Sequence, residues 1–386
     1  MIDYDADLLK HHVRTEGWLP RCKRRHKSVS ESGTPRRLRY FTFCASGAID
    51  VLMLDVANLL GSVSGSDRKF DNVSFFDKDP DSVRTTQVNI PFAVGFSGDF
   101  VDTVLIEDSE SDDEDSALLE QISSGDPLQP VAESEDKIST RRLQRRLGNH
   151  LEFKKRFPFD IVNLDLEEYL FKPTEELPGR VINAMRKVFA WQRNSFTIPS
   201  HRGEKTLDGF TLMFTTQVGP PNLTENYLLM LQDYIEKNLQ SDTSLFDVFR
   251  SRTGFTTVTE LRANSFRDFF MLAIPKTIAS TLMEEDWYID PEAGLCIYEY
   301  ERQQTNGDPY KIIHLVMDVK RQTPPKKRRA PGIVQTVEAQ NAYKRFAAQI
   351  FQQPPITLKE ENLDSDELKS SLSKIILRRK KYSKAD

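Results

Sequence analysis

Residues 40–50, YFTFCASGAID, constrain the fold more than any other stretch of this sequence. An apolar run breaks at Ala45, Ser46 and Gly47, and apolar residues then return from Ile49 onward at the 3.6-residue spacing of a helix. The pattern predicts a β-strand, a tight turn and an α-helix. In open α/β sheets, such a turn presents backbone N–H groups and the positive end of the helix to an anionic ligand, and small residues let the ligand approach closely.

The same kind of unit follows several times along the chain. Further apolar runs predict strands that end near Phe76, Gly98, Leu164 and Val218, with helices between them. The period then changes, because residues 295–303 and 310–321 read as two strands joined through Asn306 and Gly307, a strong hairpin signal. We therefore predict an α/β fold with a Rossmann-like, mostly parallel sheet and a C-terminal antiparallel hairpin.

The chain is long enough for one large domain or two smaller ones. We expect a short helix over 3–16 followed by a basic loop, and a helix over about 333–352 followed by a charged helix or tail. The predicted organisation has five parts: an N-terminal segment at 1–37, the Rossmann-like domain at 38–321, an acidic disordered insertion at 107–140 and a helical insertion at 224–286 within that domain, and a basic C-terminal segment at 322–386.

Charge is distributed unevenly. The net charge is −5, yet residues 107–137 hold twelve acidic residues and one lysine, so the rest of the chain is mildly basic. The acidic stretch has the composition of a disordered loop and predicts a protein partner. Basic clusters suit RNA or DNA backbones, although each could equally be a solvated surface; they lie at 21–27, 36–39, 141–146, 326–329 and 378–384.

Several classes of protein fit the sequence poorly. The three cysteines lie far apart without a CxxC pair, and the six histidines form no metal-ligand pattern, so we expect no disulfide framework and no metal site. The GxxxxGK[ST] and GxSxG motifs are absent. With no apolar signal core and no long apolar run, we expect no membrane association and a cytoplasmic, reducing location.

Acidic residues follow three of the predicted strands. Asp77 could bind the hydroxyls of a ribose or cap the helix at Pro80, and Asp99 could contact a ligand or only form a turn. Asp165 follows an apolar strand and should emerge at the carboxyl edge of the sheet, where ligands bind; the alternative is a helix cap. Glu167 and Glu168 are expected in the first turn of that helix.

The order of these elements resembles that of class I S-adenosylmethionine-dependent methyltransferases. The resemblance implies that Cys44, Ala45, Ser46 and Gly47 surround the methionine part of S-adenosylmethionine. It also implies that Asp77 binds the ribose, that Asp99 lies near the adenine amine and that Asp165 faces the methyl group. The CASG and NLD segments are similar to those of tRNA guanine-N2 dimethyltransferases, which implies catalysis at Asp165 on a nucleic acid.

This sequence departs from that pattern in three ways. No proline follows Asp165, no aromatic residue of the NPPY type is present there to stack on a flipped base, and Gly47 is the only glycine of the first loop. One alternative is therefore a catalytically degenerate methyltransferase fold that acts as a scaffold in a nucleic-acid assembly, and another is a different Rossmann enzyme acting on a small molecule. Trp191, Phe196 and Phe210 could contact a substrate, although aromatic residues are more often part of the core.

Overall fold

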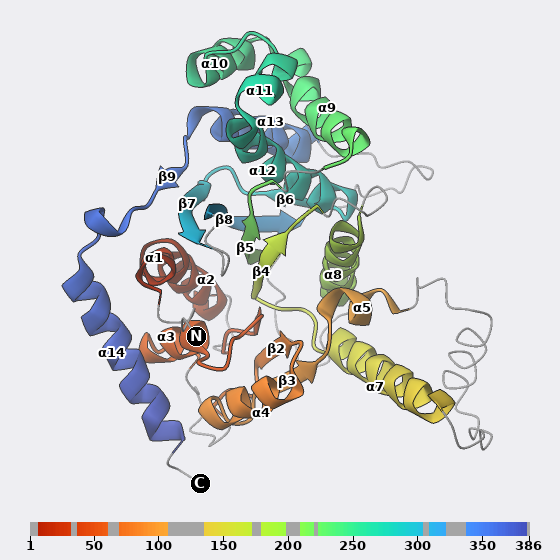
Figure 1. The fold of residues 1–386 in the computed structure, drawn as a ribbon, viewed down its shortest axis with the longest axis vertical. Coiled ribbons are helices and arrows are strands. Elements are labelled where there is room, and N and C mark those ends of the chain that lie inside the picture. The colour runs from red at the N-terminus through yellow and green to blue at the C-terminus, as the bar shows by residue number, and fades with distance from the viewer. Residues whose placement is uncertain are drawn as a thin grey trace.

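The computed structural model describes residues 7–31, 37–60, 69–106, 135–171, 179–197, 209–219, 223–303, 309–321 and 337–383. Within these ranges a single sheet runs through the molecule, with helices on both of its faces (Figure 1). Its strands follow the order β3-β2-β1-β4-β5-β8-β7-β9, and β6 also pairs with β8.

The first five strands are parallel to one another. They are β1 (Tyr40–Thr42), β2 (Val73–Asp77), β3 (Val94–Ser97), β4 (Ile161–Tyr169) and β5 (Gly209–Gln217). The helices that follow them in the chain are α3 (Ile49–Val56), α4 (Pro80–Asn89), α5 (Phe100–Val104), α7 (Glu135–Lys155) and α8 (Arg180–Thr197). This doubly wound order places all five carboxyl ends at one edge and confirms the predicted fold class.

The second half of the sheet is antiparallel. β8 (Pro309–Arg321) runs between β5 and β7 (Cys296–Gln303), antiparallel to both, so the predicted hairpin is confirmed. Two short strands were not predicted, β6 (Trp287–Ile289) and β9 (Ile356–Thr357). The predicted helical insertion is present as four helices: α9 (Glu225–Ser241), α10 (Ser244–Thr253), α11 (Val258–Asn264) and α12 (Phe266–Glu284).

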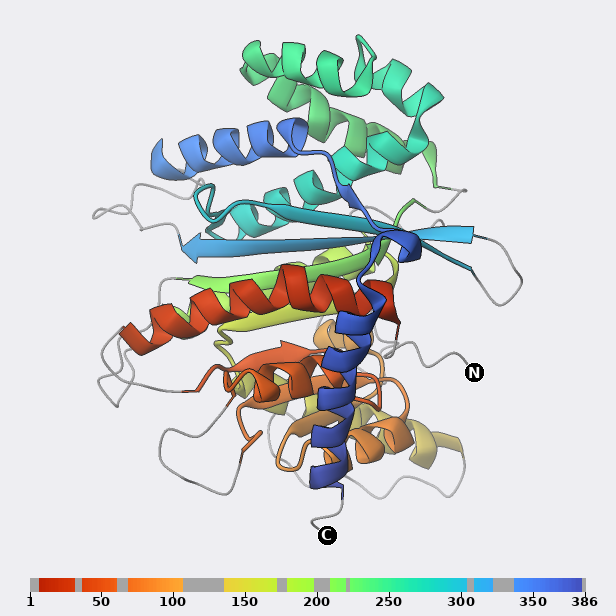
Figure 2. The same ribbon diagram turned by 90° about the vertical axis from the view of Figure 1, so that its left-hand side faces the viewer.

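The N-terminal segment is helical for longer than expected. The helix α1 (Leu8–His12), the π-helix η2 (Val13–Trp18) and α2 (Leu19–Glu31) follow one another, so residues predicted as a basic loop are a helix. The reason is burial of one face, since Cys22 and Val29 lie in the core. Figure 2 shows these helices on one side of the antiparallel strands and α12 with α13 (Val337–Gln352) on the other.

β4 also extends beyond its predicted end. We expected the strand to stop at Leu164 and a helix to begin beside Glu167 and Glu168, but pairing with β5 continues to Tyr169. The register shifts between Asp165 and Tyr169, so the pairing there is irregular. The expectation of a helical first turn here was wrong, because neighbouring-strand hydrogen bonds hold this segment in the sheet.

The core lies on both faces of the sheet. Phe41, Phe76, Phe100 and Phe153 form part of an aromatic cluster in which the rings of Phe41 and Phe153 lie 4.7 Å apart. Trp191 and Phe210 belong to the same core, with side chains 7% and 1% exposed, so neither is available to stack on a substrate. The side chain of Phe196 lies outside the described part.

The C-terminal helix α14 (Ser365–Tyr382) packs against α1 and α3 (Figures 1 and 2). The predicted acidic insertion lies outside the described residues up to position 134, and its last residues, from Glu135, belong to α7, so disorder was the wrong expectation for that end. The basic cluster at 326–329 is also outside the described residues. Across the described helices, none is both long and apolar enough to cross a membrane.

Candidate functional site

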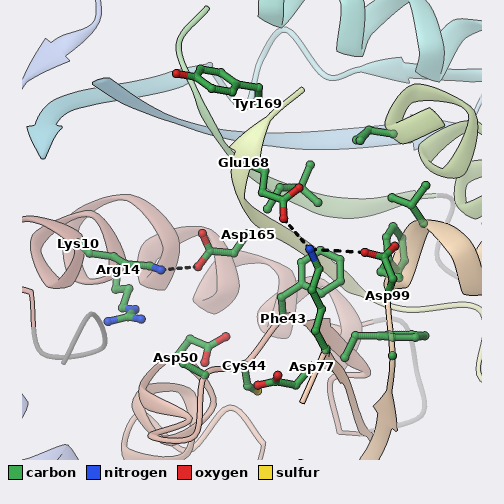
Figure 3. A pocket seen from close by; sticks show the side chains of 18 residues that line it. Lys10, Arg14, Phe43, Cys44, Asp50, Asp77, Asp99, Asp165, Glu168 and Tyr169 are labelled. Atoms are coloured by element: carbon green, nitrogen blue, oxygen red, sulfur yellow. Dashed lines mark hydrogen bonds and ion pairs between the residues drawn. The ribbon is translucent and has the colours of Figure 1, made fainter. Parts of the chain in front are cut away.

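A cavity of about 420 Å³ opens at the carboxyl edge of the parallel strands, between β1, β2, β3 and β4 (Figure 3). The N-terminal helices close one side of it. Eighteen residues line the cavity: Lys10, Arg14, Phe43, Cys44, Ala45, Asp50, Phe76, Asp77, Lys78, Gly98, Asp99, Phe100, Val101, Asp165, Leu166, Glu168, Tyr169 and Val181. Five carboxylates and three cationic side chains are among them, so acidic groups predominate.

The first loop contributes only part of its predicted residues. Cys44 and Ala45 line the cavity, whereas Ser46 and Gly47 are not among its lining residues. The carbonyl of Ser46 instead accepts a hydrogen bond of 2.6 Å from the Asn89 side chain, which ties the loop to α4. Ala48 precedes α3 in the left-handed region, at a φ of 47°. The turn therefore reaches the cavity through its first half.

Asp77 and Asp99 both reach the cavity wall from the ends of neighbouring strands. Asp77 ends β2 and accepts hydrogen bonds from the backbone N–H of Asp79 at 2.9 Å and from the Ser82 hydroxyl. The cap of α4 is Asp79, not Asp77, so the capping alternative for Asp77 was wrong. Asp99 is itself the N-cap of α5 and accepts from the N–H of Asp102 at 3.1 Å. Each carboxylate keeps acceptor positions for a ligand.

Lys78 lies between Asp99 and Glu168 in the cavity wall, a position that the sequence did not reveal. Its ammonium is 2.6 Å from Glu168 and 3.5 Å from Asp99, whose side chains converge across the cavity (Figure 3). The hydrogen bond to Glu168 raises the pKa of Lys78. Asp165, Leu166 and Glu168 all line the cavity. Regular alternation would place Asp165 and Glu168 on opposite faces of β4, but the register shifts between Asp165 and Tyr169, and no local sequence pattern indicates this irregularity.

Asp165 lies inside β4 opposite Thr215 of β5, so it is neither at a strand end nor a helix cap. One carboxylate oxygen, Oδ2, is 2.7 Å from the Lys10 ammonium, and the two side chains are 7% and 5% exposed. Burial alone would raise the pKa of Asp165, but the Lys10 charge holds it below its usual value. The other oxygen, Oδ1, is buried and accepts no hydrogen bond from the described residues.

Asp50 is a further buried acid that the sequence did not single out. Its Oδ2 accepts hydrogen bonds of 2.7 Å from the hydroxyls of Tyr40 and Thr42. The amide of Asn163 donates to the same two hydroxyl oxygens, at 3.0 and 3.1 Å. This network joins β1, β4 and the first turn of α3, and it fixes the floor of the cavity.

Lys10 and Arg14 are the residues that sequence reasoning missed most clearly. They are 4 residues apart on α1 and η2 and both line the cavity, although Asp165 is far from them in the sequence. A weak local signal exists, since the i, i+4 spacing places two cations on one helix face. Nothing local indicates that this face meets the edge of the sheet.

No protein family model matches this chain, and no curated protein matches it. Among solved structures, the chain is similar to the plantazolicin methyltransferase BamL, in complex with a triazolic desmethylPZN analog and SAH. The identity is 7%, the TM-score is 0.26, and the match covers 81% of this chain and 96% of that chain. A TM-score this low does not establish a shared fold, so the site is assigned from its own geometry.

Over the described residues, no group of three His, Cys, Asp or Glu side chains could hold a metal ion. Cys22 and Cys44 are buried cysteines outside any disulfide, and burial raises the pKa of the Cys22 thiol, so it is not a thiolate near pH 7. The functional groups of the described cavity wall are therefore mainly carboxylates and cations at the carboxyl edge of a parallel sheet. Such a site suits a polar organic ligand that carries hydroxyl, amine and cationic groups.

Proposed function

We propose that this protein is an S-adenosylmethionine-dependent methyltransferase. The observation that carries the proposal is the convergence of Asp77, Asp99 and Asp165 on one cavity at the carboxyl edge of a Rossmann-like sheet. The volume of about 420 Å³ lies within the range of small-molecule sites. The C-terminal antiparallel hairpin of β7 and β8, which pairs with β5 through β8, is the arrangement that the resemblance to class I methyltransferases implies.

The residues of the cavity fit that cofactor. S-adenosylmethionine, when bound, supplies an electrophilic methyl group on a positively charged sulfur. Asp77 would accept hydrogen bonds from the ribose hydroxyls, and Asp99 would accept one from the adenine amine. Cys44 and Ala45 would lie against the methionine part. The excess of carboxylates over cations among the lining residues favours a ligand with a positive charge.

Asp165 is the residue to which we assign catalysis. Asp165 lines the cavity, and its buried Oδ1 accepts no hydrogen bond from the described residues. We assign to Oδ1 the hydrogen bond from the group to be methylated. A carboxylate there orients the acceptor, stabilises the positive charge that develops on it as the methyl group arrives, and can accept the proton that the acceptor then loses. We expect Asp165→Asn to abolish methyl transfer and to leave cofactor affinity within about threefold.

Calorimetric titration with S-adenosylmethionine tests the cofactor assignment. Asp77→Asn should weaken binding by about tenfold or more, because the loss of a charge-assisted pair of hydrogen bonds costs more than 1 kcal/mol. Asp81→Asn is the matched control, since Asp81 is an exposed acid of the adjoining helix. Absence of binding by the unaltered protein at millimolar cofactor would refute the methyltransferase proposal and favour the scaffold alternative.

A nucleic acid is the substrate class that we propose. Support comes from α7, where Arg141, Arg142, Lys154 and Lys155 are exposed, while Arg145 donates a hydrogen bond to Ser97 directly before the Gly98 wall of the cavity. Part of the predicted basic surface is internal, however: Arg21 bonds the carbonyl of Gly294. The exposed residues of α7 therefore matter more than the cluster at 21–27.

Fluorescence anisotropy with RNA and DNA oligonucleotides at several salt concentrations tests the substrate class. Replacing both Arg141 and Arg142 with Ala should weaken the binding of oligonucleotides of every sequence. It should also lower the slope of log K against log salt concentration by about two, because each lysine or arginine that contacts a phosphate adds about one to that slope. The control replaces Lys359 and Lys369 with Ala, because both are exposed and lie outside α7. An unchanged salt slope in the α7 variant would contradict this docking surface.

A further inference from the structure

The ion pair between Lys10 and Asp165 joins the N-terminal helix to the cavity wall formed by β4 (Figure 3). The ammonium occupies Oδ2 at 2.7 Å, and Oδ1 is left as a buried acceptor without a hydrogen bond from the described residues. We propose that Lys10 is the positioning residue of this site: it fixes the Asp165 carboxylate so that Oδ1 accepts a hydrogen bond from an N–H or O–H group of the methyl acceptor. The inference rests on the function proposed above.

The geometry leaves little freedom to Asp165. Its backbone pairs with Thr215, and its side chain is held at one oxygen by a cation that is itself only 5% exposed. A buried acceptor atom without a partner is costly, so a ligand with a donor hydrogen is favoured there and an anionic group is disfavoured. The N-terminal helix thereby takes part in choosing the substrate, although it carries none of the residues that the resemblance assigned.

The charged neighbours of Asp165 determine how the pair responds to pH. Lys10 and Arg14 face it from the N-terminal helices, His314 from β8, and Asp50 and Glu168 share the same cavity. Burial lowers the pKa of His314 to about 3, so this ring is neutral near pH 7 and adds no positive charge. Lys10 is therefore the main group that keeps Asp165 ionised.

Carbon-13 NMR of labelled aspartate follows the Asp165 carboxyl directly, without any ligand, and Asp165→Asn identifies its signal. In Lys10→Met we expect the titration midpoint to rise by about one pH unit or more, and Lys10→Arg should restore it. Lys23→Met is the matched control, because Lys23 is exposed on the same run of helices. An unchanged midpoint in Lys10→Met would overturn the proposed role.

A second measurement compares two cofactor analogues by calorimetry. Sinefungin carries an amine in place of the methyl-bearing sulfonium, whereas S-adenosylhomocysteine has a bare sulfur there. We expect sinefungin to bind about tenfold tighter, with the preference lost in Asp165→Asn and, at pH 5, reduced in Lys10→Met but not in Lys10→Arg.

The two proposals fail in different ways. Equal affinity for both analogues in the unaltered protein would overturn the role of Asp165 and Lys10 while leaving the cofactor site standing. Failure of both analogues to bind would refute the cofactor itself, and with it this inference. Thermal melting of each variant shows whether a loss of binding comes from unfolding.

Discussion

The ammonium of Lys78 lies 2.6 Å from Oε1 of Glu168, so the residue directly after β2 is bonded to one within β4 across the opening of the cavity. The same ammonium is 3.5 Å from Asp99. Lys78 thus neutralises part of the acidic wall from the side of the cavity that is most exposed to solvent. A cationic ligand and Lys78 compete for these carboxylates.

Lys78→Met should therefore strengthen the binding of S-adenosylmethionine. The two acids would lose their contact with the Lys78 ammonium, and the exposure of these side chains limits the gain to about two- to fivefold. The gain should fade at high salt, because partly exposed charges are screened. Calorimetry at 50 mM and 500 mM salt checks this expectation; weaker binding at low salt would show instead that Lys78 itself contacts the ligand.

Removal of the Asp50 side chain should destabilise the protein strongly. In Asp50→Ala the hydroxyls of Tyr40 and Thr42 lose a charged acceptor inside the core, which costs about 2–4 kcal/mol in the free energy of unfolding. Urea denaturation measures the loss. Asp81→Ala should change it by less than about 0.5 kcal/mol, because Asp81 is exposed; equal losses in both variants would contradict the structural role of Asp50.

Lys276→Met should stabilise the protein. Lys276 is fully buried in α12, and burial lowers its pKa well below the usual value. Because the unfolded chain binds a proton that the folded chain disfavours, the stability of the unaltered protein rises with pH up to about 10.4. The gain from Met, about 1–2 kcal/mol near pH 7, should shrink by pH 10.

Thermal unfolding at the two pH values measures this difference, with the exposed Lys374→Met as control. A gain that stays constant with pH would mean that Lys276 remains protonated in the folded state under both conditions.

The packing of α14 against α3 should weaken at low pH, because it depends on the ionised carboxylate of Asp55. Asp55 of α3 is fully buried and accepts hydrogen bonds from Arg378 at 2.7 Å and Tyr382 at 2.8 Å. Burial opposes ionisation, but these bonds and that of Lys69 hold the pKa of Asp55 below its usual value. The folded-state pKa is depressed, so the stabilisation is present above about pH 4 and is lost as the pH falls through the folded-state pKa.

We expect Asp55→Asn to release α14 at pH 7, as faster amide hydrogen exchange over Ser365–Tyr382, and to differ less from the unaltered protein near pH 3. Asp366→Asn, an exposed acid on the same helix, is the control. Equal exchange in the two variants at pH 7 would contradict the role of Asp55.

The sequence predicted the parallel strands and the hairpin because both depend on local patterns. Apolar runs ending at Asp77 and near Gly98, and the change of period after Leu295, are visible without any knowledge of the neighbours. The extent of β4 was not visible, since what continues it past Leu164 is pairing with β5, more than forty residues away in the chain.

The residues of the candidate site also fall into two groups, those that a local sequence pattern reveals and those that only tertiary packing brings to the site. Asp77, Asp99 and Asp165 were found because each lies at or just beyond a predictable strand, and the structure brings all three to one cavity. Their assigned roles stay predictions. Lys10 and Arg14 were missed because their contact with the site depends on how one helix packs against the sheet, which no local pattern encodes.

The wall of the cavity that carries Lys10 is itself supported from the far end of the chain. The ring of His11, the next residue, lies 3.2 Å from the hydroxyl of Ser371 on α14, 360 residues away. During synthesis, the five parallel strands and the three acids leave the ribosome well before α14 does. The supported form of the site is consequently a late product of translation, and a chain stalled before residue 365 would hold its acids without the finished wall beside them.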